Sequence, residues 1–227
     1  MVKLSSMKNF DRRKFIKTTS LSAAFAASTN LFSNVQRPSN QKYMGDFAAP
    51  KIDKIKIAFV GVGYRGQGHI KRFGSFPNTQ IVAVSDLHET NISKSLSIID
   101  NLKTSKSHTN PKTYYGNKDK WRLMLKETDA DIVVISTDWD THGIMAIETM
   151  KNNMHAFVEV PLANTIKDLW EIVNTSEKFQ KHCMMMENVN YGREELMFLN
   201  ICRKGLLGEL YHGCLLYTSP SPRDSDQ

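Results

Sequence analysis

The sequence predicts an α/β fold: a doubly wound parallel sheet, followed by the start of a truncated α+β domain. Three observations support this prediction. Short, continuous apolar runs recur along the chain, as strands buried on both faces of a parallel sheet require. Amphipathic stretches of helical length separate these runs, and strands that alternate with helices pair in parallel. A glycine-rich turn follows the first run directly and indicates a tight strand-to-helix connection.

The predicted elements follow in order from the first apolar run. We expect strands at 56–60, 81–86, 131–136, 156–160 and 183–186, and helices at 68–73, 89–102, 118–127, 141–152, 166–180 and 193–201. In the helix at 166–180, we expect Leu169, Trp170 and Val173 to face the core. A polar loop rich in Lys, Ser, Thr and Asn ends at Pro111, and a further strand begins at Leu210.

The glycine turn predicts a nucleotide site. Gly61 permits the tight turn, Gly63 lets the backbone approach a pyrophosphate, and Gly66 allows close packing of the helix on the strand. The N-terminus of that helix offers backbone N–H groups to phosphate. Asp86 lies twenty residues after Gly66, at the end of the second strand. Its carboxylate would accept hydrogen bonds from a ribose diol and repel a 2′-phosphate, which predicts NAD rather than NADP.

Composition excludes several other classes of function. The formal net charge is +7 and the sequence pI is about 9.2, but the lysines are scattered and no nucleic-acid-binding motif accompanies them. We therefore attribute the charge to a leader and to solvated helix faces. The three cysteines, Cys183, Cys202 and Cys214, have neither metal-ligand spacing nor an even count, so we expect no metal site. No segment is long and apolar enough to predict a stable membrane span.

The N-terminal residues predict export. Arg12 and Arg13, followed by Phe15 and a weakly apolar run from Leu21 to Ala27, resemble a twin-arginine signal. We expect the twin-arginine export machinery to carry the folded protein to the periplasm or the medium. The expected organisation is a signal at 1–30, a linker at 31–54, an NAD-binding domain at 55–187, the start of a substrate domain at 188–213 and a non-native tail at 214–227.

Polar residues follow several predicted strands, and the carboxyl ends of parallel strands meet at one edge of a sheet. They are Gly61 to Gly66, Asp86, Ser136 to His142, Glu159 with Val160, and Asn188. This pattern resembles the Gfo/Idh/MocA family of nicotinamide-dependent oxidoreductases, which carry a Ser-Thr…His turn after one strand and a Glu-Lys-Pro motif after the next. Here the second motif reads Glu159-Val160-Pro161, and valine cannot perform the acid–base chemistry of lysine.

Within that family, several motifs are similar to glycoside hydrolase family 109, whose members are NAD-dependent α-N-acetylgalactosaminidases. These motifs are Gly63-Tyr-Arg-Gly-Gln-Gly-His69, Asp138-Trp139 before His142, Val158-Glu-Val-Pro161 and Met185-Met-Glu-Asn-Val-Asn-Tyr191. The resemblance runs from about residue 54 to about residue 213. It implies that NAD is contacted by Tyr64, Arg65, Asp86, Trp139, Asp140, Thr141, His142, Glu159, Val160 and Asn188.

The resemblance also implies a reaction on a glycoside or a glycan terminus. A sugar hydroxyl is oxidised, the glycosidic oxygen is eliminated, water adds, and the sugar is reduced again. Such chemistry needs general acids and bases rather than the usual carboxylate pair. The catalytic candidates are His142, Glu159 and Tyr191. Each has a plainer alternative: His142 bonds a ribose or the backbone, Glu159 positions the nicotinamide ribose or amide, and Tyr191 is a packing aromatic.

Two other functions remain open from the sequence. An ordinary Gfo/Idh/MocA sugar dehydrogenase would accumulate NADH with its sugar, although Val160 in place of lysine argues against it. A non-catalytic nucleotide-binding protein would bind NAD without turnover. Because we expect the substrate domain to be truncated, we also expect the 227-residue chain to lack activity by itself.

Overall fold

The structure is a computed structural model that describes residues 42–102, 108, 110–210 and 212. The described residues from Tyr43 onward belong to one compact unit. The predicted signal, all of the linker before residue 42, Cys214 and the predicted tail lie outside the described residues. No helix in the described part of the chain is long and apolar enough to cross a bilayer.

The predicted doubly wound parallel sheet is confirmed. Its strands are β1 (Ile55–Val60), β2 (Thr79–Ser85), β3 (Lys112–Tyr114), β4 (Ile132–Ile135), β5 (His155–Glu159) and β6 (Cys183–Met186). They pair in parallel in the order β3-β2-β1-β4-β5-β6. The winding direction reverses at β1, which lies between β2 and β4. In such sheets, ligands bind beyond the carboxyl ends of the strands at this reversal.

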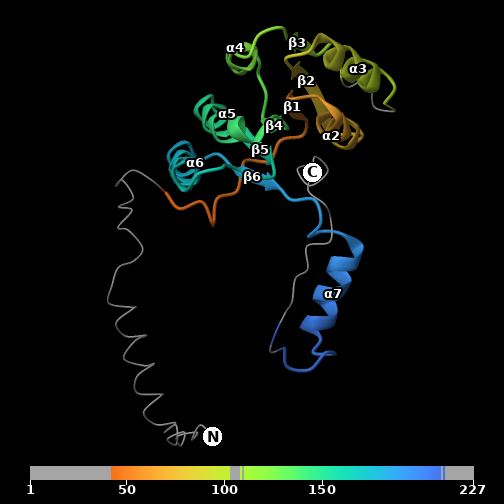
Figure 1. Ribbon diagram of the computed structural model, residues 1–227, viewed down its shortest axis with the longest axis vertical. Coiled ribbons are helices and arrows are strands. Elements are labelled where there is room, and N and C mark those ends of the chain that lie inside the picture. Colours follow the sequence, from red (N-terminus) through yellow and green to blue (C-terminus); the bar gives the residue numbers. More distant parts are fainter. Residues whose placement is uncertain (1–41, 103–107, 109, 211, 213–227) are drawn as a thin grey trace, which may run out of the picture. The chain divides into compact units, whose positions relative to one another are not determined.

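Helices cover both faces of the sheet (Figure 1). They are α2 (Tyr64–Gly74), α3 (Glu89–Asp100), α4 (Lys120–Glu127), α5 (Trp139–Lys151) and α6 (Ile166–Phe179). A further helix, α7 (Arg193–Arg203), follows β6 and does not cover the sheet. On one face, Ile70 of α2 and Ile92 of α3 join a buried cluster with Phe59. On the other, the cluster contains Met124 of α4, Met145 of α5 and Ile172 of α6. Burial on both faces explains why the strands read as continuous apolar runs.

One strand was missed by the sequence predictions, and one prediction about the buried face of a helix was wrong. The loop ending at Pro111 leads directly into β3, which has only three residues and no apolar alternation to announce it. In α6, Ile172 is 2% exposed, whereas Leu169, Trp170 and Val173 are 39%, 45% and 40% exposed. The helix carries apolar residues on adjacent faces, and its packing against α5 selects the face of Ile172.

The strand predicted from Leu210 lies largely outside the described residues. Leu210 and His212 lie outside any strand, and residues 211 and 213 are not among the described residues. The helix predicted at 193–201 is present as α7 and contains no buried residue. The assignment of residues 188–213 to a substrate domain stays a prediction.

Candidate functional site

The glycine turn between β1 and α2 needs glycine for three different reasons. Gly61 has a φ of 78°, and a Cβ there would lie 2.5 Å from the carbonyl oxygen of Ser136. A Cβ on Gly66 would meet the carbonyl oxygen of Gly61, so this glycine allows the helix to approach the turn. A Cβ on Gly63 would meet nothing within 4 Å. Gly63 therefore keeps space open above the turn rather than relieving strain.

The same turn leaves the start of α2 without a side-chain cap. Gly63 is the N-cap residue, and its missing side chain makes no capping hydrogen bond. The first N–H groups of an α-helix have no partner inside the helix. With the open space at Gly63, they form an anion site of the kind that holds a pyrophosphate.

Asp86 connects this turn to the end of β2. Its Oδ2 accepts a hydrogen bond from the Val62 N–H at 2.8 Å. Its Oδ1 accepts from the His88 N–H at 2.9 Å and from Nδ2 of Asn91 at 3.1 Å. The carboxylate is therefore held in a fixed orientation. Each carboxylate oxygen has about two acceptor positions, so Oδ2 retains one for a ribose hydroxyl.

A cleft of about 330 Å³ lies at the carboxyl ends of β1, β2 and β4, beside this carboxylate. We refer to it as the first cleft. It is lined by the glycine turn, Asp86, Asn91, Asn117, Lys118, Trp121 and the β4–α5 turn, including Thr137, Asp138 and Thr141. The hydroxyls of Thr137 and Thr141 lie 2.8 Å apart and fix that turn. The cleft occupies the position at the strand reversal where a doubly wound sheet binds ligands.

Two predicted NAD contacts, Trp139 and Asp140, line a different groove between α5 and α6. Oδ1 of Asp140 accepts a hydrogen bond from Nδ2 of Asn164 at 2.6 Å. The structure therefore separates these two residues from Thr141, although all three stand next to each other in the sequence. The first turn of a helix points successive side chains about 100° apart, which explains the separation.

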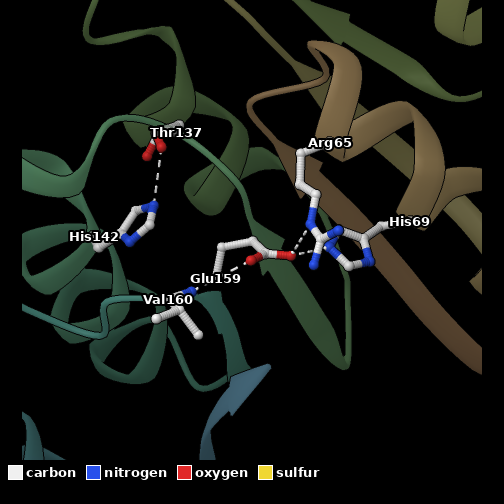
Figure 2. Close-up of polar contacts among 6 residues, drawn as sticks. All are labelled: Arg65, His69, Thr137, His142, Glu159 and Val160. Atoms are coloured by element: carbon white, nitrogen blue, oxygen red, sulfur yellow. Dashed lines mark hydrogen bonds and ion pairs between the residues drawn. The ribbon is translucent and has the colours of Figure 1, made fainter. Parts of the chain in front are cut away.

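His142 is buried, with 1% of its surface exposed. Its Nδ1 lies 2.7 Å from the carbonyl oxygen of Pro161. Its Nε2 lies 3.0 Å from the carbonyl oxygen of Thr137 (Figure 2). The ring therefore ties the β4–α5 turn to the segment after β5. Both ring nitrogens thus face backbone carbonyls. This geometry agrees with the alternative in which His142 bonds the backbone rather than transfers a proton.

Glu159, at the end of β5, is the centre of a polar cluster with Arg65 and His69 (Figure 2). Its Oε1 accepts from Nε of Arg65 at 2.6 Å and lies 2.5 Å from Nε2 of His69. Burial favours the neutral acid, but the hydrogen bonds from Arg65 and His69 outweigh it and lower the pKa of Glu159. Glu159 is consequently ionised at neutral pH.

His69 is 4% exposed, and burial lowers the pKa of its ring despite the bond to Glu159. The neutral ring donates its Nε2–H to Glu159, which leaves Nδ1 as an acceptor. No described residue offers Nδ1 a hydrogen bond. His69 was not among the site residues predicted from the sequence. Its position four residues after Arg65 on one helix face was the signal available.

A second cleft, of about 580 Å³, lies between α2 and the segment that follows β6. Arg65, His69, Asn188 and Tyr191 line it, and the Tyr191 side chain is largely exposed. Glu187 also lines it, but its Oε2 accepts from the N–H groups of Val189 and Asn190 at 2.8 and 2.7 Å. These bonds lower the pKa of Glu187. Asn188 and Tyr191 thus line the same cleft as Arg65 and His69 of the Glu159 cluster. His142 does not line this cleft.

The first cleft and the glycine turn beside it fit a dinucleotide. The open glycine turn and uncapped helix suit a pyrophosphate, and the oriented carboxylate of Asp86 suits a ribose diol. Val160 is 43% exposed at the end of β5, and Tyr64 is 96% exposed at the start of α2. Both therefore lie on the surface at the edge where the ligand is expected. No group of three or more His, Cys, Asp or Glu residues suited to a metal occurs in the described part of the chain.

Comparison with known proteins agrees with this geometry. Residues 55–187 match the model of the Gfo/Idh/MocA oxidoreductases, which describes their NAD-binding Rossmann fold. The chain belongs to the Gfo/Idh/MocA oxidoreductase family. Solved structures similar to this family member include the WlbA dehydrogenase of Chromobacterium violaceum in complex with NADH and UDP-GlcNAcA, with a TM-score of 0.60 and 21% identity over 72% of this chain and 44% of that one. At this identity, the likeness shows the fold alone.

A scyllo-inositol dehydrogenase of Lactobacillus casei with bound NAD(H) and scyllo-inositol matches with a TM-score of 0.58 and 14% identity, over 69% of this chain and 43% of that one. Closer in sequence are a glycosyl hydrolase family 109 protein of Shewanella putrefaciens, at 43% identity, and an α-N-acetylgalactosaminidase of Shewanella oneidensis, at 42%. Each match covers 93% of this Gfo/Idh/MocA chain and 46% of the relative. The chain thus spans about half the length of the curated relatives it matches.

Proposed function

We propose that this chain is the NAD-binding part of a glycosidase that releases terminal α-N-acetylgalactosamine from glycosides. The observation that carries the proposal is 42% identity, over 93% of the chain, to the α-N-acetylgalactosaminidase of Shewanella oneidensis. The two clefts support it, because the first suits a dinucleotide and the second is lined by polar residues suited to a sugar.

The residues that would hold NAD lie at the carboxyl ends of the strands. Gly63 and the start of α2 would bind the pyrophosphate, and Asp86 would bind the adenosine ribose. When bound, NAD supplies a reversible hydride acceptor for a sugar carbon. The negative charge of Asp86 disfavours the 2′-phosphate of NADP.

Glu159 and Glu187 do not supply the general acid of ordinary two-carboxylate hydrolysis. That mechanism needs one carboxyl group with a raised pKa to protonate the leaving oxygen. Both carboxylates beside the second cleft have lowered pKa values, because N–H donors surround them. Neither is a ready general acid. A route through oxidation and elimination has no need of such a carboxylic acid pair.

Within this route, we assign the proton-handling roles to Glu159 and Tyr191 rather than to His142. Glu159 is ionised, and its Oε2 makes only a 3.3 Å contact with the N–H of Val160 among the described residues. Tyr191 presents an exposed hydroxyl to the second cleft. Each ring nitrogen of His142 faces a backbone carbonyl, and a neutral ring donates its N–H to one of them, so we assign His142 to holding the turn that carries Thr137 and Thr141.

The test is release of nitrophenol from a nitrophenyl α-N-acetylgalactosaminide, with absorbance at 340 nm recorded in parallel. It uses the longest reading frame that encodes this chain, purified without added nucleotide. We expect catalytic release with no net accumulation of NADH. NADH that accumulates with free sugars, without nitrophenol release, would indicate a dehydrogenase. NAD binding without either signal would indicate a non-catalytic nucleotide-binding protein.

A further inference from the structure

The cluster of Arg65, His69 and Glu159 is not explained by folding alone. The cluster joins the first turns of α2 to the end of β5. His69 and Glu159 lie 90 positions apart in the sequence. The Oε1 atom of Glu159 receives both donors, Nε of Arg65 at 2.6 Å and Nε2 of His69 at 2.5 Å. A single carboxylate oxygen therefore fixes two side chains that line the second cleft.

The pair of Arg65 and Glu159 would be mobile without a third member. The Arg65 side chain is 46% exposed, and a half-exposed ion pair alone gains little in water. His69 is different, because its side chain, which projects from α2, is only 5% exposed and is held by the packing around it. Its bond to Glu159 anchors the carboxylate in the sheet, and the carboxylate in turn orients the guanidinium.

Arg65 stands in the first turn of α2, two residues after the N-cap Gly63. Binding through Nε leaves the terminal guanidinium N–H groups without a bond to any described residue. A planar guanidinium of this kind suits phosphate oxygens. Arg65 is thus close in the chain to the uncapped helix start, where the pyrophosphate is expected, and its side chain lines the second cleft.

We propose that His69 is a positioning residue, which acts through Glu159 to hold Arg65 against the diphosphate of the bound nucleotide. The proposal deepens the nucleotide-binding part of the proposed function. It requires a neutral ring that donates from Nε2, and the other ring nitrogen, Nδ1, has no described partner. Glu159 is thus the one polar contact that the described residues give to this buried ring, and it is the contact that the proposal uses.

The test compares His69→Leu with His69→Gln in the complete 227-residue chain. Glutamine places an amide N–H donor near the position of Nε2, whereas leucine fills the space without a donor. Affinities for NAD and ADP-ribose are measured by calorimetry, and affinity for adenosine by NMR titration, because adenosine has no phosphate. We expect His69→Leu to lower the affinity for NAD and for ADP-ribose at least about fivefold and to change the affinity for adenosine by less than about twofold. His69→Gln should restore the affinity for NAD and ADP-ribose.

The pH dependence of NAD binding provides a readout that a packing role would not move. The charged and titratable groups around His69 are Arg65 and Arg72 from α2, Glu159 from β5, and Glu187 with Tyr191 after β6. Loss of the His69 donor raises the pKa of Glu159, so Glu159 takes up its proton sooner as the pH is lowered. NAD affinity should therefore begin to fall at a higher pH in His69→Leu than in the unmutated chain.

Two results would overturn the proposal. One is equal affinity for NAD and ADP-ribose in His69→Leu and in the unmutated chain. The other is an equal loss in both variants for all three ligands, which would mean that His69 only supports the fold. Failure of the glycosidase proposal would instead be seen in the nitrophenol assay, and it would leave these affinities unchanged.

Discussion

The Oδ2 atom of Asp86 accepts a hydrogen bond from the backbone N–H of Val62 at 2.8 Å. The carboxylate at the end of β2 is thereby tied to the middle of the glycine turn between β1 and α2. The hydrogen bond therefore connects the position expected for the ribose with the turn expected to hold the pyrophosphate. Cofactor preference and turn geometry should therefore respond together to changes at Asp86.

Asp86→Ser should weaken NAD binding about 10- to 100-fold and shift the ratio of NADP to NAD affinity at least tenfold toward NADP. The variant removes charge-assisted hydrogen bonds to the ribose and the repulsion of a 2′-phosphate. Calorimetric titration with both nucleotides measures the ratio. An unchanged ratio would show that Asp86 does not contact the ribose.

Gly61→Ala and Gly63→Ala form a matched pair. At Gly61, the positive φ and the clash with Ser136 predict a loss of about 2 kcal/mol or more in the free energy of unfolding. At Gly63, the added methyl group meets no protein atom within 4 Å, so stability should change by less than about 1 kcal/mol. NAD affinity should nevertheless fall at least tenfold, because the methyl group occupies the phosphate position. Urea unfolding and NAD titration of both variants separate the two effects.

His155 begins β5, at the end of the strand opposite Glu159. We expect it to make the folded protein less stable in acid. Burial, together with Lys181 and His182, lowers its pKa to about 4, and its Nδ1 accepts the His182 N–H at 2.8 Å. The unfolded chain, with an ordinary histidine pKa near 6.5, binds the proton first. Stability is therefore complete above about pH 6.5 and falls toward pH 4, by about 1–2 kcal/mol once the ring's partial exposure is counted. His155→Asn, which keeps an acceptor that does not titrate, should flatten this part of the stability–pH curve measured by urea unfolding.

His108 should be essential for the β2 side of the sheet. Its Nδ1 accepts from the Ile81 N–H at 3.1 Å, and its Nε2 donates to the carbonyl of Gly74 at 2.8 Å. His108→Ala would leave two buried backbone groups without these partners and cost about 2–4 kcal/mol. His88→Ala, at an exposed position, serves as the control and should cost less than about 0.5 kcal/mol. Similar stability of the two variants would contradict the prediction.

Export by the twin-arginine route remains a proposal based on the sequence. Replacement of Arg12 and Arg13 by lysine keeps the charge but removes the paired arginines. The doubly substituted protein should remain in the cytoplasm, whereas the unmutated protein should be found in the periplasm or the medium. Cell fractionation followed by immunoblotting measures the distribution. Equal export of both proteins would exclude the route.

The sequence was sufficient for the parts of the site that are local in the chain. Gly61, Gly66 and the strands β1, β4 and β5 follow from apolar runs and turn chemistry over a few residues. The burial of α6 did not follow, because only its contact with α5 decides which apolar face is inside. The role of His69 was missed for a related reason. Its partner, Glu159, comes from a distant strand, and no local pattern announces a contact between them.

The measurement that tests the proposed chemistry most directly is hydrolysis of an α-N-acetylgalactosaminide in D₂O, followed by mass spectrometry of the released sugar. Oxidation and elimination remove a proton from the carbon beside the oxidised one, and solvent returns it when water adds. We predict one carbon-bound deuterium in each released N-acetylgalactosamine. Released sugar that carries no carbon-bound deuterium would show that the glycosidic bond is broken by direct hydrolysis, and it would contradict the redox route.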